Sequence, residues 1–351
     1  MDCKYKLFPL PFMAALLSVL CLSTGCTNNS PKYSSIDGFA QGSTFHLVYR
    51  EPDNGTTINL PDSLSGYFTL IDNSLSGYNP NSAVSAVNRG ESPVLDSLFI
   101  ECFDLSEEMY RNTNGLFDIS AAPLFDIWGF GFNNRESVTQ GKIDSIMAFV
   151  GMDKLTINRD TATKTGILEK GDPRMKVNFN AIAQGYTCDF ICRKLQQMGI
   201  SDYLLEVGGE ILCKGKNPKG KEWSIGIDKP VDGNFTPGEA VEAIIEVSDK
   251  GVVTSGNYRK FYMIEGEKYS HTINPKNGYP VKHNLLSATV VAPTAAMADA
   301  YATYFMVIGL QEAIKVIEQN NSLEAVLVYS NNGQMQTYCS AGIVEKKMKQ
   351  H

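Results

Sequence analysis

The chain has 351 residues, of which 43% are hydrophobic and 20% charged, and its formal net charge is −7. This length suffices for one large lobe or two closely packed lobes with a proper hydrophobic core. An acidic chain argues against nucleic acid as a partner, because the two charges repel each other. Any attachment to an anionic membrane would therefore need an anchor other than the protein surface.

The first residues have the pattern of an export signal. Lys4 and Lys6 precede an apolar run from Leu7 to Leu22, and small residues then lead to Gly25-Cys26. A charged start, a short apolar stretch and a small-residue cleavage region are typical of a signal peptide, and the run is short for a membrane span. Gly25-Cys26 resembles a bacterial lipobox, in which the cysteine is lipidated. We expect residues 1–25 to be a lipoprotein signal peptide, with ordinary signal cleavage nearby as the alternative.

The region after the signal divides into a tether and one domain. Residues 26–35 are rich in Asn, Ser and Pro and are predicted to form a flexible tether. We find no internal repeat or linker in the remainder, so 36–351 is predicted to be a single domain. Five cysteines follow Cys26 without CxxC spacing, so we expect small buried hydrophobic residues rather than disulfides or a zinc site.

The first half of this domain is predicted to be mainly helical. The segment 36–50 contains an alternating apolar strand next to a tight glycine turn at Gln41-Gly-Ser-Thr44. Apolar residues then recur at helical spacing. Helices are expected over 64–75, 82–88, 94–113 and 142–150.

The second half alternates strands with a few helices. Strands are expected over 176–179, 203–207, 223–227, 241–247, 251–254, 261–264, 285–292 and 324–330. Helices are expected from about 186 to 199, over 294–309 and over 311–319. This succession predicts an α+β fold in which a mainly antiparallel sheet is flanked by helices.

The helix over 294–309 carries two hard oxygen donors on one face. Thr294 is a good N-cap and Gly309 a good stop, while Asp299 and Thr303 lie one turn apart. A carboxylate and a hydroxyl suit Mg²⁺, which takes few protein ligands and completes its shell with phosphates and water. The alternative is a buried helix with one exposed acid.

Four polar clusters with small or glycine-rich backbone suggest phosphate binding. They are residues 115–123, 178–186, 254–258 and 271–278. Backbone N–H groups at such turns and at strand-to-helix junctions bind phosphate readily. None of the clusters is a Walker loop, a Rossmann fingerprint or a nucleophile elbow, which disfavours the common NTPases, dehydrogenases and serine hydrolases.

Taken in order, these clusters and their neighbours resemble the ApbE family of flavin transferases over about residues 36–340. The matching stretches are Gly42-Ser-Thr44, Ser76-Gly-Tyr-Asn-Pro80, Gly115-Leu-Phe-Asp-Ile-Ser-Ala-Ala-Pro-Leu124, Trp128-Gly-Phe-Gly131, Ala181-Ile-Ala-Gln-Gly-Tyr186 with Asp189, Glu206-Val-Gly-Gly-Glu210, Thr254-Ser-Gly-Asn-Tyr258, Ser270-His-Thr-Ile-Asn-Pro275 with Gly278, and Ala298-Asp-Ala300 with Thr303. The resemblance implies a two-lobed fold and Mg²⁺-dependent cleavage of the FAD pyrophosphate. FMN would pass to a Thr or Ser hydroxyl of a target protein as a phosphoester, and AMP would be released.

The resemblance also implies which residues hold the metal ion and FAD. The Mg²⁺ ligands would be Asp299, Thr303 and the backbone carbonyl of Ala181, with Asp299 serving catalysis through the ion. The positions matching FAD contacts are Gln41, Tyr78, Leu116, Phe117, Asp118, Asn178, Gln184, Ser255, Gly256, His271 and Ile273. We expect the Phe117 ring to supply stacking area. Three of these positions depart from the family: Gln41 stands where Met is usual, Asn178 where Asp is frequent, and Gln184 where Lys or Glu is common. Asn178 can form hydrogen bonds but cannot act as a base.

His271 is the expected proton-handling or leaving-group-stabilising residue. Its unperturbed pKa lies near working pH, which suits general acid or base catalysis. A structural role, in which His271 fixes the following turn, is an equal alternative. A suitable pKa does not establish catalysis unless the ring also lies within hydrogen-bond reach of the reacting group.

The family resemblance further implies a location and partners. We expect a lipoprotein anchored through Cys26 and facing the periplasm, on the inner membrane. Its acceptors would be subunits of ion-pumping redox complexes of the Na⁺-pumping NADH:quinone reductase or Rnf type. Two alternatives stay open: an FAD pyrophosphatase that releases FMN and AMP, and a flavin-binding lipoprotein without turnover. A Tyr rather than an Asn at position 78 is typical of the transferring branch.

Overall fold

The computed structural model describes residues 31–52, 59–131, 138–230, 240–257, 261–264, 267–343 and 345–346. From Lys32 onward the described chain forms one compact unit. The expected signal peptide, Cys26 and Tyr258 lie outside the described residues. Within them, no helix combines the length and apolar character that a membrane crossing needs.

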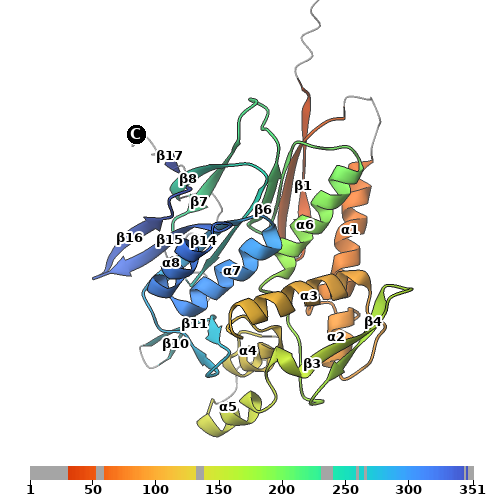
Figure 1. The fold of residues 1–351 in the computed structure, drawn as a ribbon, viewed down its shortest axis with the longest axis vertical. Coiled ribbons are helices and arrows are strands. Elements are labelled where there is room, and N and C mark those ends of the chain that lie inside the picture. The colour runs from red at the N-terminus through yellow and green to blue at the C-terminus, as the bar shows by residue number, and fades with distance from the viewer. Residues whose placement is uncertain are drawn as a thin grey trace, which may run out of the picture. The chain divides into compact units, whose positions relative to one another are not determined.

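One eight-stranded sheet organises this unit (Figure 1). Its strand order is β1-β2-β5-β6-β9-β14-β15-β16, and every neighbouring pair is antiparallel. The strands are β1 (Tyr33–Ala40), β2 (Ser43–Arg50), β5 (Tyr203–Val207), β6 (Glu210–Lys214), β9 (Lys250–Gly256), β14 (Leu285–Ala292), β15 (Glu324–Asn331) and β16 (Gln334–Cys339). The mainly antiparallel sheet expected from the sequence is confirmed.

Four smaller sheets accompany it within the described ranges, and they are also antiparallel. They are β3 (Leu155–Asp160) with β4 (Thr165–Lys170), β7 (Trp223–Asp228) with β8 (Val241–Val247) and β17 (Glu345–Lys346), β10 (Phe261–Ile264) with β11 (Glu267–Ser270), and β12 (Ile273–Asn274) with β13 (Tyr279–Pro280).

Apart from α4, which the sequence did not predict, the helices fall close to the predicted ranges. They are α1 (Leu60–Leu75), α2 (Ala83–Asn88), α3 (Ser97–Asn112), α4 (Ala122–Trp128), α5 (Gln140–Met147), α6 (Ala183–Gln197), α7 (Ala295–Ile308) and α8 (Leu310–Gln319), with short 3₁₀ turns at Ile119–Ala121 and Met152–Lys154. The expected caps form at α7, where the Thr294 side chain accepts a hydrogen bond from Met297 N and Gly309 ends the helix. The α+β fold class is therefore confirmed.

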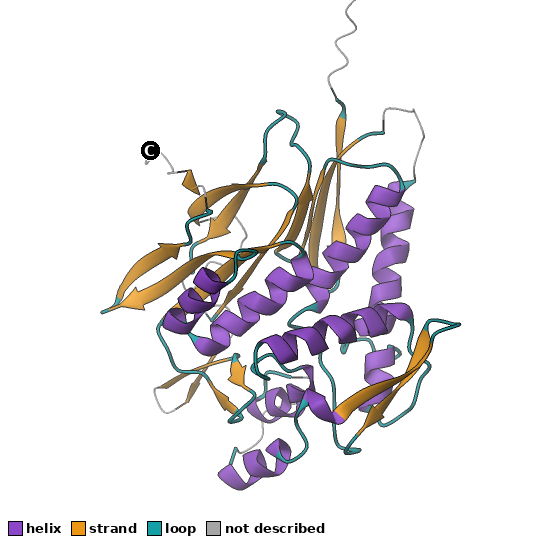
Figure 2. Cartoon of the chain, viewed as in Figure 1, coloured by secondary structure: helices purple, strands orange, loops and turns teal. Residues whose placement is uncertain are grey.

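The main sheet is covered on both faces (Figure 2). Helices α6 and α7 pack on one face, where Val253 of β9 joins the largest core cluster. The opposite face carries Val252, which packs with Ile225 of β7 and Ile245 of β8. Burying an aliphatic side chain of this size is worth about 2 kcal/mol. Burial on both faces explains why β14 is almost continuously apolar instead of alternating.

Three local predictions need correction. The strand expected over 176–179 does not form, because the Asn88 side chain pairs with both backbone groups of Val177 and takes the place of a neighbouring strand. Strand β1 begins at Tyr33, so the end of the expected tether belongs to the sheet. The sequence did not predict strands β3, β4, β6, β11, β12, β13, β16 and β17. The five described cysteines are free thiols, four of them buried, as expected.

Candidate functional site

Helix α7 presents Asp299 to the start of helix α6. The Asp299 Oδ2 atom accepts a hydrogen bond from Gly185 N at 3.2 Å, and the residue is 5% exposed. In an uninterrupted helix Gly185 N would instead donate to the carbonyl of Ala181, four residues earlier. The contact therefore brings the expected carboxylate ligand to the turn that carries the expected carbonyl ligand.

Thr303 follows one turn later on the same helix and meets strand β9. Its Oγ1 lies 3.5 Å from Ser255 Oγ. Residues four apart on a helix share a face, so the Thr303 hydroxyl lies along the same side of α7 as Asp299. Thr303 is partly buried, as is Ser255. The two ligands predicted on α7 and the predicted FAD contact on β9 are thus gathered at one edge of α7.

Electrostatics at Asp299 favour a bound cation. Burial raises the pKa of the Asp299 carboxyl to about 7, the hydrogen bond from Gly185 N lowers it, and the charge of nearby Asp189 raises it. A buried carboxylate without a counter-charge is disfavoured in its ionised form, and a nearby cation reverses that preference. Among the described residues, no group donates a hydrogen bond to the other Asp299 oxygen.

These donors fit Mg²⁺ by chemistry. A carboxylate, a hydroxyl and a carbonyl are the hard oxygen ligands that this ion prefers, with its other positions left for water and phosphate. Within the described chain, no three His, Cys, Asp or Glu side chains gather as an ordinary metal centre requires. The candidate centre depends instead on one acidic side chain and two neutral oxygens.

Two tight turns contact the first turns of α6, where Gln184 and Thr187 lie. Gln41, in the β1–β2 turn, has a positive φ of 52°, and its Nε2 donates to Thr187 Oγ1 at 2.9 Å. Its Oε1 is buried and has no hydrogen-bond partner in the described structure. Gln184 packs against Gly208 in the β5–β6 turn, where a Cβ would collide with the Gln184 amide. A buried acceptor without a donor is unfavourable by about 1–3 kcal/mol, so Gln41 is suited to a ligand that donates.

The segment 116–118 is placed differently from expectation in one respect. The Phe117 ring is 3% exposed and belongs to the main core, so this ring has no free face for stacking. Asp118 caps the following 3₁₀ turn, its Oδ1 accepting from Ser120 N at 2.8 Å and from Ser120 Oγ at 2.6 Å. Burial raises the pKa of Asp118 to about 6, against a lowering by the Ser120 hydrogen bonds. Leu116 is partly buried.

Tyr78 and Asn178 meet at a neighbouring loop. The Tyr78 side chain is 70% exposed, and its hydroxyl accepts a hydrogen bond from Asn180 Nδ2 at 3.3 Å. Asn178 Oδ1 accepts from Asn180 N at 2.8 Å, and Asn178 N donates to Ile119 O at 2.9 Å. The loop thereby links the exposed Tyr78 ring to the segment that contains Asp118.

His271 lies next to Phe130 and precedes a residue that is bonded to the end of β9. Its ring packs edge-on to Phe130, with 6.4 Å between centroids. The next residue, Thr272, donates to Asn257 Oδ1 at 2.8 Å, which ties this segment to the end of β9 beside Ser255 and Gly256. Ile273 is buried in a separate cluster with Trp128.

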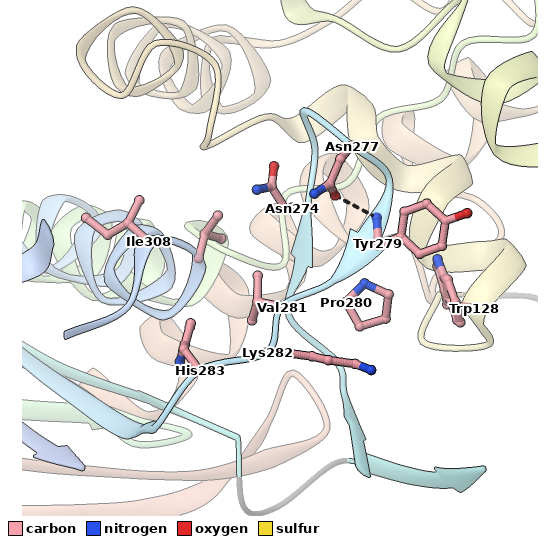
Figure 3. Close-up of a pocket in the computed structure, with 10 residues that line it drawn as sticks. Trp128, Asn274, Asn277, Tyr279, Pro280, Val281, Lys282, His283 and Ile308 are labelled. Atoms are coloured by element: carbon pink, nitrogen blue, oxygen red, sulfur yellow. Dashed lines mark hydrogen bonds between the residues drawn. The ribbon is translucent and has the colours of Figure 1, made fainter. Parts of the chain in front are cut away.

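A cavity of about 650 Å³ adjoins this region without including the expected site residues (Figure 3). Ile308, at the end of α7, lies on one side of it, and the contacting rings of Trp128 and Tyr279 lie on the other. The cavity begins at Val307, one turn beyond Thr303 on α7.

Sequence reasoning placed Asp189 and Gly185 in a motif but gave them no role. Asp189 accepts hydrogen bonds from Ala295 N at 2.8 Å and Ala296 N at 2.9 Å. Burial raises the pKa of Asp189 to about 6. At Gly185 a Cβ would lie 2.9 Å from Ala296 Cα, which is too close for any other residue. Gly185 and Asp189 are four residues apart on α6 and therefore share a helix face, which could have indicated that both contact the same neighbouring helix.

Comparison with known proteins finds relatives that match most of the chain. Residues 42–327 match the model of the ApbE family. The FAD:protein FMN transferase of Haemophilus influenzae is 32% identical over 323 residues, covering 90% of this chain and 92% of the relative. That of Escherichia coli strain K12 is 31% identical over 328 residues, covering 90% of each.

Two solved structures share the fold. The flavin transferase ApbE from Vibrio cholerae has a TM-score of 0.76 and 28% identity, covering 89% of this chain and 98% of that one. The flavinyl transferase ApbE of Pseudomonas stutzeri in its apo form has a TM-score of 0.77 and 27% identity, covering 89% and 95% respectively. Both matches extend over nearly the whole described unit.

Proposed function

This chain belongs to the ApbE family, and from that premise we propose that it is an FAD:protein FMN transferase that depends on Mg²⁺. It is an enzyme of the transferase class. In the proposed reaction the FAD pyrophosphate is cleaved, FMN is attached to a Ser or Thr hydroxyl of a target protein through a phosphoester, and AMP leaves.

The observation that carries this proposal is the contact between Asp299 and Gly185 N. It holds a carboxylate against the turn containing Ala181, while Thr303 extends the same helix face toward Ser255. Asp299, Thr303 and the Ala181 carbonyl would hold Mg²⁺. The ion would supply charge neutralisation on the pyrophosphate, which is the main demand of phosphoryl transfer.

The remaining residues are proposed to position FAD. The partnerless Oε1 of Gln41 would accept a hydrogen bond from the dinucleotide, and the exposed ring of Tyr78 would stack on one of its rings. Asp118, Asn178 and the backbone of Phe117 would contact it from the opposite loop. His271 would hold or deliver a proton at the reacting phosphate or its leaving group.

The proposed setting is the periplasmic face of a membrane, with Cys26 lipidated and the acceptors being subunits of membrane redox complexes. The support is the sequence pattern before Cys26. Mass spectrometry of the membrane fraction tests this: a diacylated N-terminal Cys26 is expected, and an N-terminus formed at another residue would contradict it.

The reaction is tested by incubating the mature protein with FAD, Mg²⁺ and an acceptor subunit from such a complex. Flavin fluorescence that stays on the acceptor after denaturation is the expected result. Free FMN and AMP without labelled acceptor would indicate a pyrophosphatase. The absence of AMP would indicate a flavin-binding protein without turnover.

The Asp299→Ala variant tests whether the carboxylate that contacts Gly185 N is needed for the reaction. Because it removes the only proposed charged ligand, we expect the transfer rate to fall by two orders of magnitude or more while FAD binding survives in part. Glu318→Ala is the matched control, since it removes an exposed acid from the adjacent helix α8. Equal rates in the two variants would exclude the proposed centre.

A further inference from the structure

Helices α6 and α7 are joined by reciprocal contacts from carboxylate to backbone. Asp189 of α6 accepts hydrogen bonds from Ala295 N and Ala296 N, the first free donors of α7. In return, Asp299 of α7 accepts from Gly185 N, the donor one turn before Asp189 on α6. Each helix therefore supplies one acid to the opening turn of the other.

The close approach of the helices makes these contacts sensitive to small shifts. A Cβ on Gly185 would lie 2.7 Å from the Ala295 carbonyl carbon, and a Cβ on Gly251 of β9 would lie 2.5 Å from Ala295 Cα. The start of α7 is thus pressed between α6 and β9 with no side chain separating them. Because the helices are in such close contact, the two hydrogen bonds to Asp189 fix where α7 begins relative to α6.

The ordinary cap of α7 is a separate feature. Thr294 accepts from Met297 N at 3.2 Å and lies on the same chain segment as the helix it caps. It stabilises α7 internally but makes no described hydrogen bond to α6. Asp189 instead acts between helices, because its carboxylate belongs to α6 and its donors belong to α7.

We propose that Asp189 is the positioning residue of the metal centre: by holding the first turn of α7, it keeps the Asp299 carboxylate against the turn of α6 that follows Ala181, where the two residues would hold the ion. The inference rests on the proposed function for the identity of the ion. Residues that orient metal ligands from outside the coordination shell typically change metal affinity by about 10–100-fold when altered.

The test compares Asp189→Asn with Thr294→Ala in the mature protein. Asparagine keeps the shape of the side chain but turns an amino group toward one of the two N–H donors, so α7 loses its fixed start. We expect the dissociation constant for Mg²⁺, measured by calorimetry without flavin, to rise about tenfold. The Mg²⁺ concentration for half-maximal transfer should rise in parallel, while the rate at saturating Mg²⁺ stays within about threefold.

Thr294→Ala lowers the melting temperature by weakening the same helix but should leave both Mg²⁺ constants unchanged. Asp189→Glu keeps the charge and both acceptors on a longer arm, so it is expected to fold and to show a smaller rise in the Mg²⁺ constants. If Asp189→Asn does not fold, this variant decides the question. Wild-type Mg²⁺ affinity in Asp189→Glu and in any folded Asp189→Asn would overturn the inference.

Failure of the proposed function gives a different result. If Asp299→Ala also binds Mg²⁺ as wild type does, the assignment of the metal centre itself is wrong. If Asp299→Ala loses Mg²⁺ affinity and the Asp189 variants keep it, only the positioning role of Asp189 is excluded.

Discussion

The metal side and the dinucleotide side of the candidate site are built in different ways. The metal side consists of two regular helices whose acids are buried and paired with backbone donors. The dinucleotide side consists of turns from distant parts of the chain, with a residue at positive φ at Gln41 and a largely exposed ring at Tyr78. The first is rigid through packing, whereas the second depends on local turns and leaves groups open to a ligand.

Under the proposed function, the two regions would have different tasks. Placing an ion among three oxygens needs accuracy that packed helices supply, because their side chains cannot move without leaving voids or clashes. Holding a long, flexible dinucleotide needs several separated contacts, which loops on a firm scaffold provide. Substitutions on the two sides should therefore fail in different ways, by loss of stability and metal affinity on one side and by loss of flavin affinity on the other.

The largest effect is expected for Gly185→Ala on the metal side. The added methyl group would overlap the Ala295 carbonyl, and overpacking of this kind costs about 1–3 kcal/mol. We expect the free energy of unfolding in urea to fall by about 3 kcal/mol and Mg²⁺ affinity to fall with it. The control is Gly66→Ala in α1, where nothing lies within 4 Å of the added methyl group. There alanine should stabilise the protein by up to about 1 kcal/mol, and a loss equal to that of Gly185→Ala would contradict the close seam.

An intermediate effect is expected from Asp118, the partly buried acid on the dinucleotide side. Because burial raises the pKa of Asp118 to about 6, the folded state holds its proton more tightly than the unfolded state. This stability is fully present below about pH 4 and is lost as the pH rises through 6, amounting to about 2 kcal/mol. Asp118→Asn keeps the oxygen that accepts from Ser120 but cannot titrate.

The measurement is the free energy of unfolding of wild type and Asp118→Asn without flavin, from pH 4 to 7. The wild type should lose about 2 kcal/mol more than the variant over this range. Taking the difference between the two proteins removes the contribution of every other titrating group. Parallel pH profiles would show that Asp118 is solvated instead of buried.

The smallest effect is expected at Tyr78. Replacing the ring by alanine removes stacking worth about 1 kcal/mol, so the dissociation constant for FAD should rise about fivefold in a fluorescence titration. Tyr78→Phe keeps the ring and should bind FAD almost as wild type does. Because the side chain is 70% exposed, neither change should alter stability by more than about 0.5 kcal/mol. Equal loss of affinity in both variants would assign the role to the hydroxyl instead.

The sequence indicated the arrangement of residues on the expected metal side more fully than on the dinucleotide side, for a physical reason. Asp299 and Thr303 are four residues apart on a helix whose caps were readable, so their shared face followed from helical geometry alone. The pairing of Asp189 with Ala295 spans more than a hundred residues, and no local pattern reports such a contact. The same limit explains why the sequence did not reveal that the Phe117 ring is buried, since its burial depends on the packing of the whole core.

The strand order of the main sheet has a consequence for how the protein acquires its structure. The hairpin β1–β2 is the first regular element along the described chain, yet its only partner in the sheet is β5, and the Arg50–Asp202 contact beside that seam joins residues 152 positions apart. The chain loses entropy when it closes a loop of that size, before the strands gain any hydrogen bonds by pairing. We therefore expect a high contact order and slow folding. A nascent or truncated chain that stops before β5 would leave the β2 edge of this hairpin unpaired, a state prone to aggregation. The chain must therefore emerge past its midpoint before its first strands can take their place.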